Sequence, residues 1–144
     1  MTEASKAIRE FFDAYASATG SLDLAWLGSA YGETFMFASP GGVQAVRRDD
    51  FLKVVPKRGA FFRAAGLVAS EIVRLEEVPL DEKHTMVKAF WSLRFEKDSG
   101  PAVVDEIAAT YVLRRHEGAW QIVFQLDHQD LTKRVQELGL IPNH

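Results

Sequence analysis

The chain has 144 residues, of which 47% are hydrophobic and 26% charged, with a formal net charge of −3. This balance is typical of a globular domain and lacks the basic excess of a nucleic-acid-binding protein. Cysteine is absent, so disulfides, thiolate metal sites and cysteine nucleophiles are excluded. No apolar run approaches the roughly 20 residues of a membrane span, and the amino-terminal segment is not signal-like. We therefore expect one cytoplasmic domain over residues 1–144, with neither a nucleic-acid nor a membrane partner.

The first thirty residues predict two helices in close succession. The first has Thr2 as its N-cap and ends at Gly20. Its apolar stripe follows helical spacing and consists of Ile8, Phe11, Phe12 and Tyr15. The second helix is short, begins at Ser21 or Asp23, and ends at Gly32.

The next segment predicts a small hairpin followed by a third helix. Short strands at 34–37 and 43–46 flank "SPGG", whose proline and glycines make a turn. The helix "DFLKVV" is capped by Asp49 and ended by Pro56. Phe61 and Phe62 follow it and are expected in the core.

Residues 67–127 read as an antiparallel sheet, because long alternating segments are separated by turn residues. The expected strands cover 67–75, 84–97, 102–115 and 120–127, and "DLTKRVQELG" predicts a closing helix. Strands as long as 84–97 usually bend. The element order therefore predicts an α+β fold, with helices gathered on one face of a curved antiparallel sheet of four main strands plus a small hairpin.

Two local features carry a resemblance to a known family. "GAWQIV" follows a tight glycine turn at 118–123, and the acidic Asp23 opens the second helix. With the element order, these features resemble the nuclear-transport-factor-2-like superfamily, which includes ketosteroid isomerase, scytalone dehydratase and SnoaL-like polyketide cyclases. The resemblance implies a cone-shaped sheet wrapped around the amino-terminal helices, with a mostly apolar pocket inside.

The implied cone and the strand alternation together predict which side chains line that pocket. The predicted lining is Phe11, Tyr15, Trp26, Phe37, Ser39, Trp91, Ala109, Tyr111, Phe124 and His128. A regular pleat from Trp120 places His128 on the inner face, where an imidazole would hold a polar group of the ligand. A β-bulge before Asp127 would instead direct His128 to solvent. The alternative role for His128 is a structural hydrogen bond to backbone or carboxylate.

The residues present argue against the family's best-known chemistry. Matching to ketosteroid isomerase places Phe11, Ser39 and Ala109 where the oxyanion tyrosine, the base and the second acid would lie. We therefore predict no Δ5-ketosteroid isomerisation. The remaining histidines, at positions 84, 116 and 144, do not complete a two-histidine site. The sequence also suggests no metal, no cofactor and no serine–histidine–acid triad.

The favoured function is therefore binding of a small apolar or aromatic ligand in an aromatic-lined internal pocket. Two alternatives stay open: a SnoaL-like isomerase, cyclase or dehydratase acting on a polyketide- or steroid-like substrate, and a non-catalytic assembly module. We also expect a homodimer through the outer face of the sheet, because apolar side chains gather there. The predicted interface consists of Phe90, Arg94, Val112, Arg114, Gln121, Val123 and Gln125.

Overall fold

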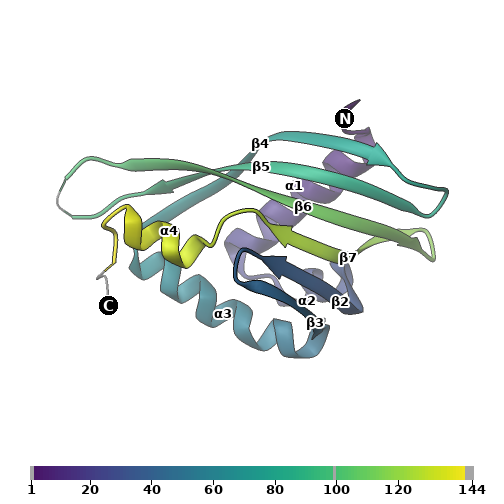
Figure 1. Cartoon of the computed structure of the whole chain (residues 1–144), viewed down its shortest axis with the longest axis horizontal. Coiled ribbons are helices and arrows are strands. Elements are labelled where there is room, and N and C mark those ends of the chain that lie inside the picture. Colours follow the sequence, from purple (N-terminus) through teal and green to yellow (C-terminus); the bar gives the residue numbers. More distant parts are fainter. Residues whose placement is uncertain (1, 99, 142–144) are drawn as a thin grey trace.

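The computed structural model describes residues 2–98 and 100–141, which form four helices and one seven-stranded sheet (Figure 1). The helices are α1 (Lys6–Ser21), α2 (Leu24–Ala30), α3 (Arg48–Ala64) and α4 (Leu131–Glu137). The strands are β1 (Thr2–Glu3), β2 (Tyr31–Ser39), β3 (Gly42–Arg47), β4 (Leu67–Pro79), β5 (His84–Phe95), β6 (Val103–His116) and β7 (Ala119–Asp127). Their order across the sheet is β1-β4-β5-β6-β7-β2-β3.

The sheet is mixed, curved and unclosed. Strands β4 to β7 are antiparallel as predicted, and so is the β2–β3 hairpin. The expectation of a wholly antiparallel sheet is wrong at one junction, because β2 runs parallel to β7. Nothing local to either strand encodes that pairing, since the two partners are far apart in the sequence. Interrupted register in β4, β7 and β2 accompanies the bend of the sheet.

Helix α1 begins and ends elsewhere than the sequence predicted. Ser5 caps it by accepting a hydrogen bond from the Ile8 N–H, whereas Thr2 pairs with Glu77 in β1. Leu22, in the left-handed conformation, closes the helix. The predicted apolar stripe is correct, because Phe12 and Tyr15 of this helix pack against Tyr111 and Trp91 on the inner face of the sheet.

Helix α2 is capped by Asp23, one of the two predicted caps, which accepts a hydrogen bond from the Trp26 N–H at 3.1 Å. The predicted end of this helix at Gly32 is wrong, because α2 ends at Ala30 and the chain passes directly into β2.

Helix α3 continues through Pro56 to Ala64, so the predicted end at the proline is wrong. An internal proline removes one backbone hydrogen bond and costs about 3 kcal/mol. Phe51, Val55 and Phe62 nevertheless place one side of the helix on the core, and tertiary packing of this kind outweighs local propensity. Phe62 is buried as expected, whereas Phe61 is exposed.

The sheet's inner face and the helices form one hydrophobic core. On β5 every second side chain is buried, namely Val87, Ala89, Trp91, Leu93 and Phe95. Helix α1 lies behind β4 to β6 in Figure 1, and α3 lies beneath β2 and β3. Helix α4 closes the carboxyl-terminal end, as predicted, with Val135 fully buried. Within the described residues, no helix is long and apolar enough to cross a membrane.

Candidate functional site

A β-bulge in β7 decides which side chains reach the interior. Leu113 of β6 pairs with Ile122, but the preceding Val112 pairs with Phe124, so Val123 is an extra residue on β7. An inserted residue reverses the faces of everything beyond it, because side chains alternate with a period of two. The strand therefore changes face between Ile122 and Phe124.

Beyond the bulge, polar residues point inward. Asp127 pairs with Ala109, whose side chain is buried on the inner face, and Leu126 pairs with Thr110 on the outer face. Gln125 lies on the same side as Asp127 and is only 7% exposed. The resemblance places an acid where Ala109 stands. Asp127 of the neighbouring strand β7 instead supplies a carboxyl beside that position.

This reversal corrects three of the predicted site residues. Phe124 and His128 do not line the interior but lie on the outer face. The His128 Nε2 is 2.7 Å from Thr110 Oγ1, and desolvation followed by the charge of Lys88 lowers the pKa of this imidazole. Gln125, expected at the outer interface, is buried inside. The structure therefore contains a bulge before Asp127, which directs His128 to the outer face as that alternative expected. Its imidazole bonds the Thr110 hydroxyl on β6, a partner that is neither the backbone nor the carboxylate of the predicted structural role.

A chain of hydrogen bonds runs across the interior from α1 through β2 to β7. Tyr31 donates its hydroxyl to Gln125 Oε1 at 2.7 Å, and Gln125 Nε2 donates to Asp127 Oδ1 at 3.0 Å. The Tyr15 hydroxyl lies 2.8 Å from that of Tyr31. Because the Tyr31 proton is committed to Gln125, Tyr15 is the donor of this pair. Every hydrogen bond in this polar chain (Tyr15, Tyr31, Gln125 and Asp127) therefore points toward the Asp127 carboxyl.

Asp127 has one carboxyl oxygen left over. Its Oδ2 has no hydrogen-bond partner among the described residues. Every fully buried side-chain oxygen or nitrogen of those residues does have a partner, so Oδ2 is not fully buried. This oxygen is consequently open to solvent or to a bound molecule. Burial raises the pKa of Asp127, while the hydrogen bond from Gln125 and the charge of Arg58 lower it in part. At a given pH, this carboxyl is therefore protonated to a greater extent than an exposed aspartate.

Two other inward carboxylates are fully occupied. Glu77 accepts from the Ser5 N–H at 2.9 Å and from the Thr85 hydroxyl at 2.7 Å, one on each oxygen. Asp105 receives two bonds from the Arg134 guanidinium, at 2.8 and 2.9 Å. Asp127 differs from both, because one of its two carboxyl oxygens has no hydrogen-bond partner among the described residues.

The aromatic residues predicted to line a pocket do come together. The Tyr15 ring lies 5.7 Å from that of Tyr111, 6.0 Å from Trp91 and 6.4 Å from Trp26, and Phe11 packs against Trp26 at 5.5 Å. Burial raises the pKa of Tyr15 and Tyr111, so their hydroxyls stay neutral. The rings pack against one another, and two surface hollows, one beside β1 and one beside α4, lie outside this cluster.

Phe37 and Ser39 complete the predicted set at the end of β2. Phe37 pairs with Gln125 and is half-buried on the inner face. Ser39 accepts the Gly41 N–H at 3.2 Å and so stabilises the β2–β3 turn instead of joining the aromatic cluster.

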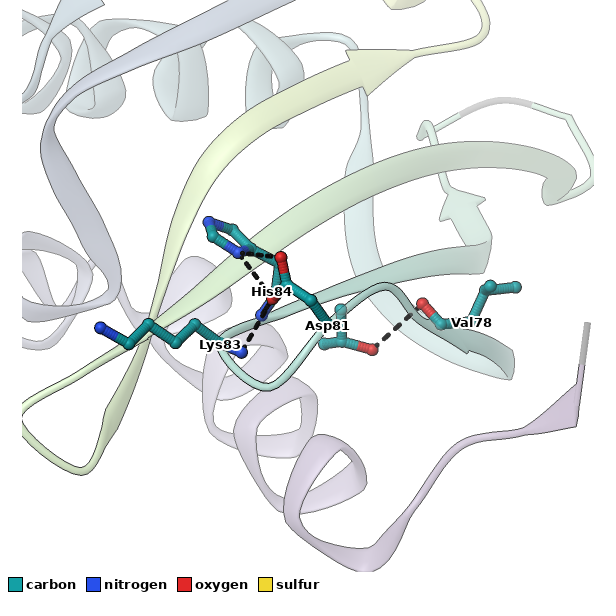
Figure 2. A network of polar contacts seen from close by, with 5 residues as sticks. Val78, Asp81, Lys83 and His84 are labelled. Carbon is teal, nitrogen blue, oxygen red and sulfur yellow. Dashed lines mark hydrogen bonds and ion pairs between the residues drawn. The ribbon is translucent and has the colours of Figure 1, made fainter.

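The other histidines take no part in this site. Figure 2 shows His84 in the β4–β5 turn, where its Nδ1 lies 2.9 Å from Asp81 Oδ1 and the same carboxylate accepts the Lys83 N–H. That hydrogen bond from His84 is the main cause that lowers the pKa of Asp81. His116 is the last residue of β6, next to the β6–β7 turn, and His144 falls outside the described residues. Within the described ranges, no group of three or more His, Cys, Asp or Glu residues is placed to bind a metal.

Sequence reasoning missed Tyr31, Gln125 and Asp127 as site residues. The one signal available is the run of three apolar residues at 122–124, which breaks the alternation of β7. Such a break is compatible with a bulge, but it does not fix the bulge's position.

A curved, unclosed sheet folded over α1 around an aromatic interior defines the class of cone-shaped α+β domains. The chain belongs to the family described as NTF2-like protein (DUF6841), which matches residues 3–130. The predicted family and fold are therefore confirmed.

Solved structures agree on the fold. An NTF2-like protein of unknown function from Shewanella oneidensis MR-1 superposes with a TM-score of 0.68 at 19% identity, covering 85% of this chain and 97% of that one. An NTF2-like protein with a cystatin-like fold from Novosphingobium aromaticivorans gives 0.71 at 16% identity, covering 96% and 88%. An NTF2-like protein from Cytophaga hutchinsonii gives 0.65 at 12% identity, covering 85% and 95%. A search of curated protein sequences found no match.

Proposed function

We propose that the protein binds a small apolar or aromatic molecule at the inner face of the sheet, with Asp127 as its polar contact. The observation that carries this proposal is the open Oδ2 of Asp127, at the end of a hydrogen-bond chain that is otherwise complete. Two other inward carboxylates, Glu77 and Asp105, have a partner on each oxygen. A half-buried carboxyl oxygen that is open to solvent and has no partner within the protein is a natural polar contact for a ligand.

The surroundings of Asp127 suit an aromatic ligand. Half-buried Phe37 and Ile107 lie on the inner face of the two strands that flank β7, so apolar surface borders the carboxyl on both sides. Asp127 Oδ2 accepts a hydrogen bond from a ligand hydroxyl when ionised and donates one to a ligand carbonyl when protonated. The polar chain holds the carboxyl in place, because Gln125 is itself fixed by Tyr31.

Binding of 2-acetylnaphthalene, a neutral aromatic ketone, tests this proposal. We expect saturable quenching of tryptophan fluorescence, and a Kd about three- to tenfold weaker in Asp127→Ala, because one hydrogen bond is lost. Glu106→Ala, on the outer face of β6, is the matched control and should leave the Kd unchanged. Absence of saturable binding, or equal affinity in Asp127→Ala and wild type, would contradict the proposal.

A second observation favours self-association. Directly paired residues of four adjacent strands place Met86, Val112, Phe124 and Met36 in one row across the outer face. Phe124 joins this apolar row only because of the bulge. Such a row is unusual on a monomer surface, and a two-fold axis through it would bury the same patch of each copy. We propose that this face forms a homodimer.

Light scattering coupled to size exclusion tests the dimer. We expect a dimer mass at tens of micromolar (an ordinary range for such contacts) and a monomer for Phe124→Glu with unchanged circular dichroism. Val104→Glu, at an exposed outer position away from the row, should remain dimeric. A monomeric wild type would exclude this interface.

A further inference from the structure

We propose that Tyr31, acting through Gln125, directs the proton of a neutral Asp127 carboxyl onto its open oxygen, so that the site binds aromatic carbonyl compounds. This inference rests on the proposed binding site at Asp127. Tyr31 is a positioning residue, because it acts on Asp127 only through Gln125. The ligand class is a neutral aromatic ketone, aldehyde or ester, whose carbonyl oxygen accepts a hydrogen bond from Asp127.

The Gln125 side chain has fixed surroundings. Its backbone pairs with Tyr111 of β6 on one side and Phe37 of β2 on the other, and the residue is only 7% exposed. Its Oε1 accepts the Tyr31 hydroxyl at 2.7 Å, and its Nε2 donates to Asp127 Oδ1 at 3.0 Å. An amide has an acceptor at one end and donors at the other. The orientation of this amide therefore decides whether Asp127 faces a donor or an acceptor.

The direction of the polar chain fixes that orientation. The Tyr15 hydroxyl has Tyr31 as its one hydrogen-bond partner among the described residues, so the Tyr15 proton is satisfied only when Tyr15 donates. Tyr31 then uses its own proton on Gln125. The reverse direction would leave the proton of the buried Tyr15 without an acceptor, which is unfavourable for a buried donor. The Tyr31 ring is itself held by Phe35 and Phe51, whose ring centres lie 4.6 and 4.7 Å away.

This orientation determines which oxygen of Asp127 carries a proton. Oδ1 accepts the Gln125 N–H, and a carboxyl oxygen is a better acceptor without a proton of its own than with one. The proton of the neutral acid therefore lies on Oδ2, the oxygen that is open to solvent. In this state Asp127 presents a donor to the ligand, and a carbonyl oxygen is the matching acceptor.

Other titratable groups do not take up this proton. Burial raises the pKa of all three tyrosines around the polar chain, namely Tyr15 on α1, Tyr31 on β2 and Tyr111 on β6. Their hydroxyls therefore stay neutral. Burial also raises the pKa of Asp127, whereas the Gln125 hydrogen bond and the charges of Arg58 and His128 lower it in part. His128 lies on the outer face, where it bonds Thr110.

Two neutral ligands of nearly the same shape test the inference. 2-Acetylnaphthalene has a carbonyl group, which 2-ethylnaphthalene replaces with a methylene. Because neither is charged, the ratio of the hydrocarbon Kd to the ketone Kd isolates the hydrogen bond to Asp127 from the titration of other groups. Isothermal titration of the wild type should give a ratio about three- to tenfold larger at pH 4 than at pH 8, because ionisation of the carboxyl removes the donor.

Two variants change the amide in different ways. Tyr31→Phe lets the amide turn its Oε1 toward Asp127, which moves the proton to Oδ1 and leaves Oδ2 as an acceptor. Gln125→Glu keeps an acceptor for Tyr31 but places a second carboxyl against Oδ1, and two such carboxyls share one proton. In both, the ratio at pH 4 should fall at least about threefold. Val135→Ala, which removes buried core volume on α4 outside the polar chain, should keep the wild-type ratio.

The outcomes separate this inference from the binding site on which it rests. A wild-type ratio that does not change with pH, or a wild-type pH response in either folded variant of Tyr31 and Gln125, overturns the inference and leaves ligand binding in place. Loss of the response in Val135→Ala as well would assign it to general loosening of the core, and this also overturns the role of Tyr31. Failure of the wild type to bind either ligand overturns the site and the inference together. Circular dichroism shows which variants are folded.

Discussion

Glu77 and Asp127 both lie on the inner face of the sheet, yet their carboxylates meet different surroundings. Glu77 lies where α1 begins, and its two oxygens bind the Ser5 N–H and the Thr85 hydroxyl. Asp127 lies at the end of β7, and only one of its oxygens is bound. The first carboxylate joins β4 and β5 to the start of α1, whereas the second is left with an open oxygen. The difference indicates that the inward acids of this domain do not share one role: Glu77 joins strands to a helix, whereas Asp127 keeps one oxygen open to solvent.

Removing the structural carboxylate should have the largest effect on stability. Glu77→Ala leaves the Ser5 N–H and the buried Thr85 hydroxyl without their acceptor, and we expect it to lower the free energy of unfolding by about 2–4 kcal/mol. Urea unfolding followed by circular dichroism measures this loss. The exposed Glu71→Ala is the control, with a change within about 0.5 kcal/mol. A Glu77→Ala variant as stable as the control would show that the two regions do not differ as described.

Breaking the ion pair of α4 should have an intermediate effect. Arg134→Met leaves the Asp105 carboxylate, whose side chain is 9% exposed, without its partner. The Arg134 side chain itself is 38% exposed, so solvent reduces the loss to about 1–2 kcal/mol. The same urea titration measures it. The double variant Asp105→Asn with Arg134→Met should recover part of the loss, and no recovery would mean that the pair itself contributes little.

Neutralising Asp127 should have the smallest effect, and one that depends on pH. Because burial raises the pKa of Asp127, the folded protein binds this proton more tightly than the unfolded chain does. The resulting stabilisation is complete below the unfolded pKa near 3.8 and is lost as the pH rises through the folded pKa. Asp127→Asn lacks this dependence, so its stability relative to wild type should increase from pH 4 to pH 7. Unfolding titrations at both pH values measure the difference, and a difference that stays constant or decreases would contradict the raised pKa.

The local patterns of the chain predicted much of this architecture correctly. The helical stripe of α1 and the Asp23 cap each depend on residues close together in the sequence, and each is found as expected. The α3 boundary was wrong because the cost of Pro56 is local, whereas the packing that outweighs it involves distant elements. The same holds for the parallel β2–β7 pair, whose partners are joined only in the folded chain.

The sequence by itself determined the fold class and the aromatic character of the interior, because apolar periodicity and turn residues are local properties, and its resemblance to a known family pointed to the family that the match over residues 3–130 shows. Only the tertiary structure decided which acid reaches that interior. One extra residue at Val123 reverses the end of β7, so Gln125 and Asp127 replace Phe124 and His128 on the inner face. The bulge is a property of how β7 pairs with β6, so the alternation of β7 by itself does not predict which of its residues is left unpaired.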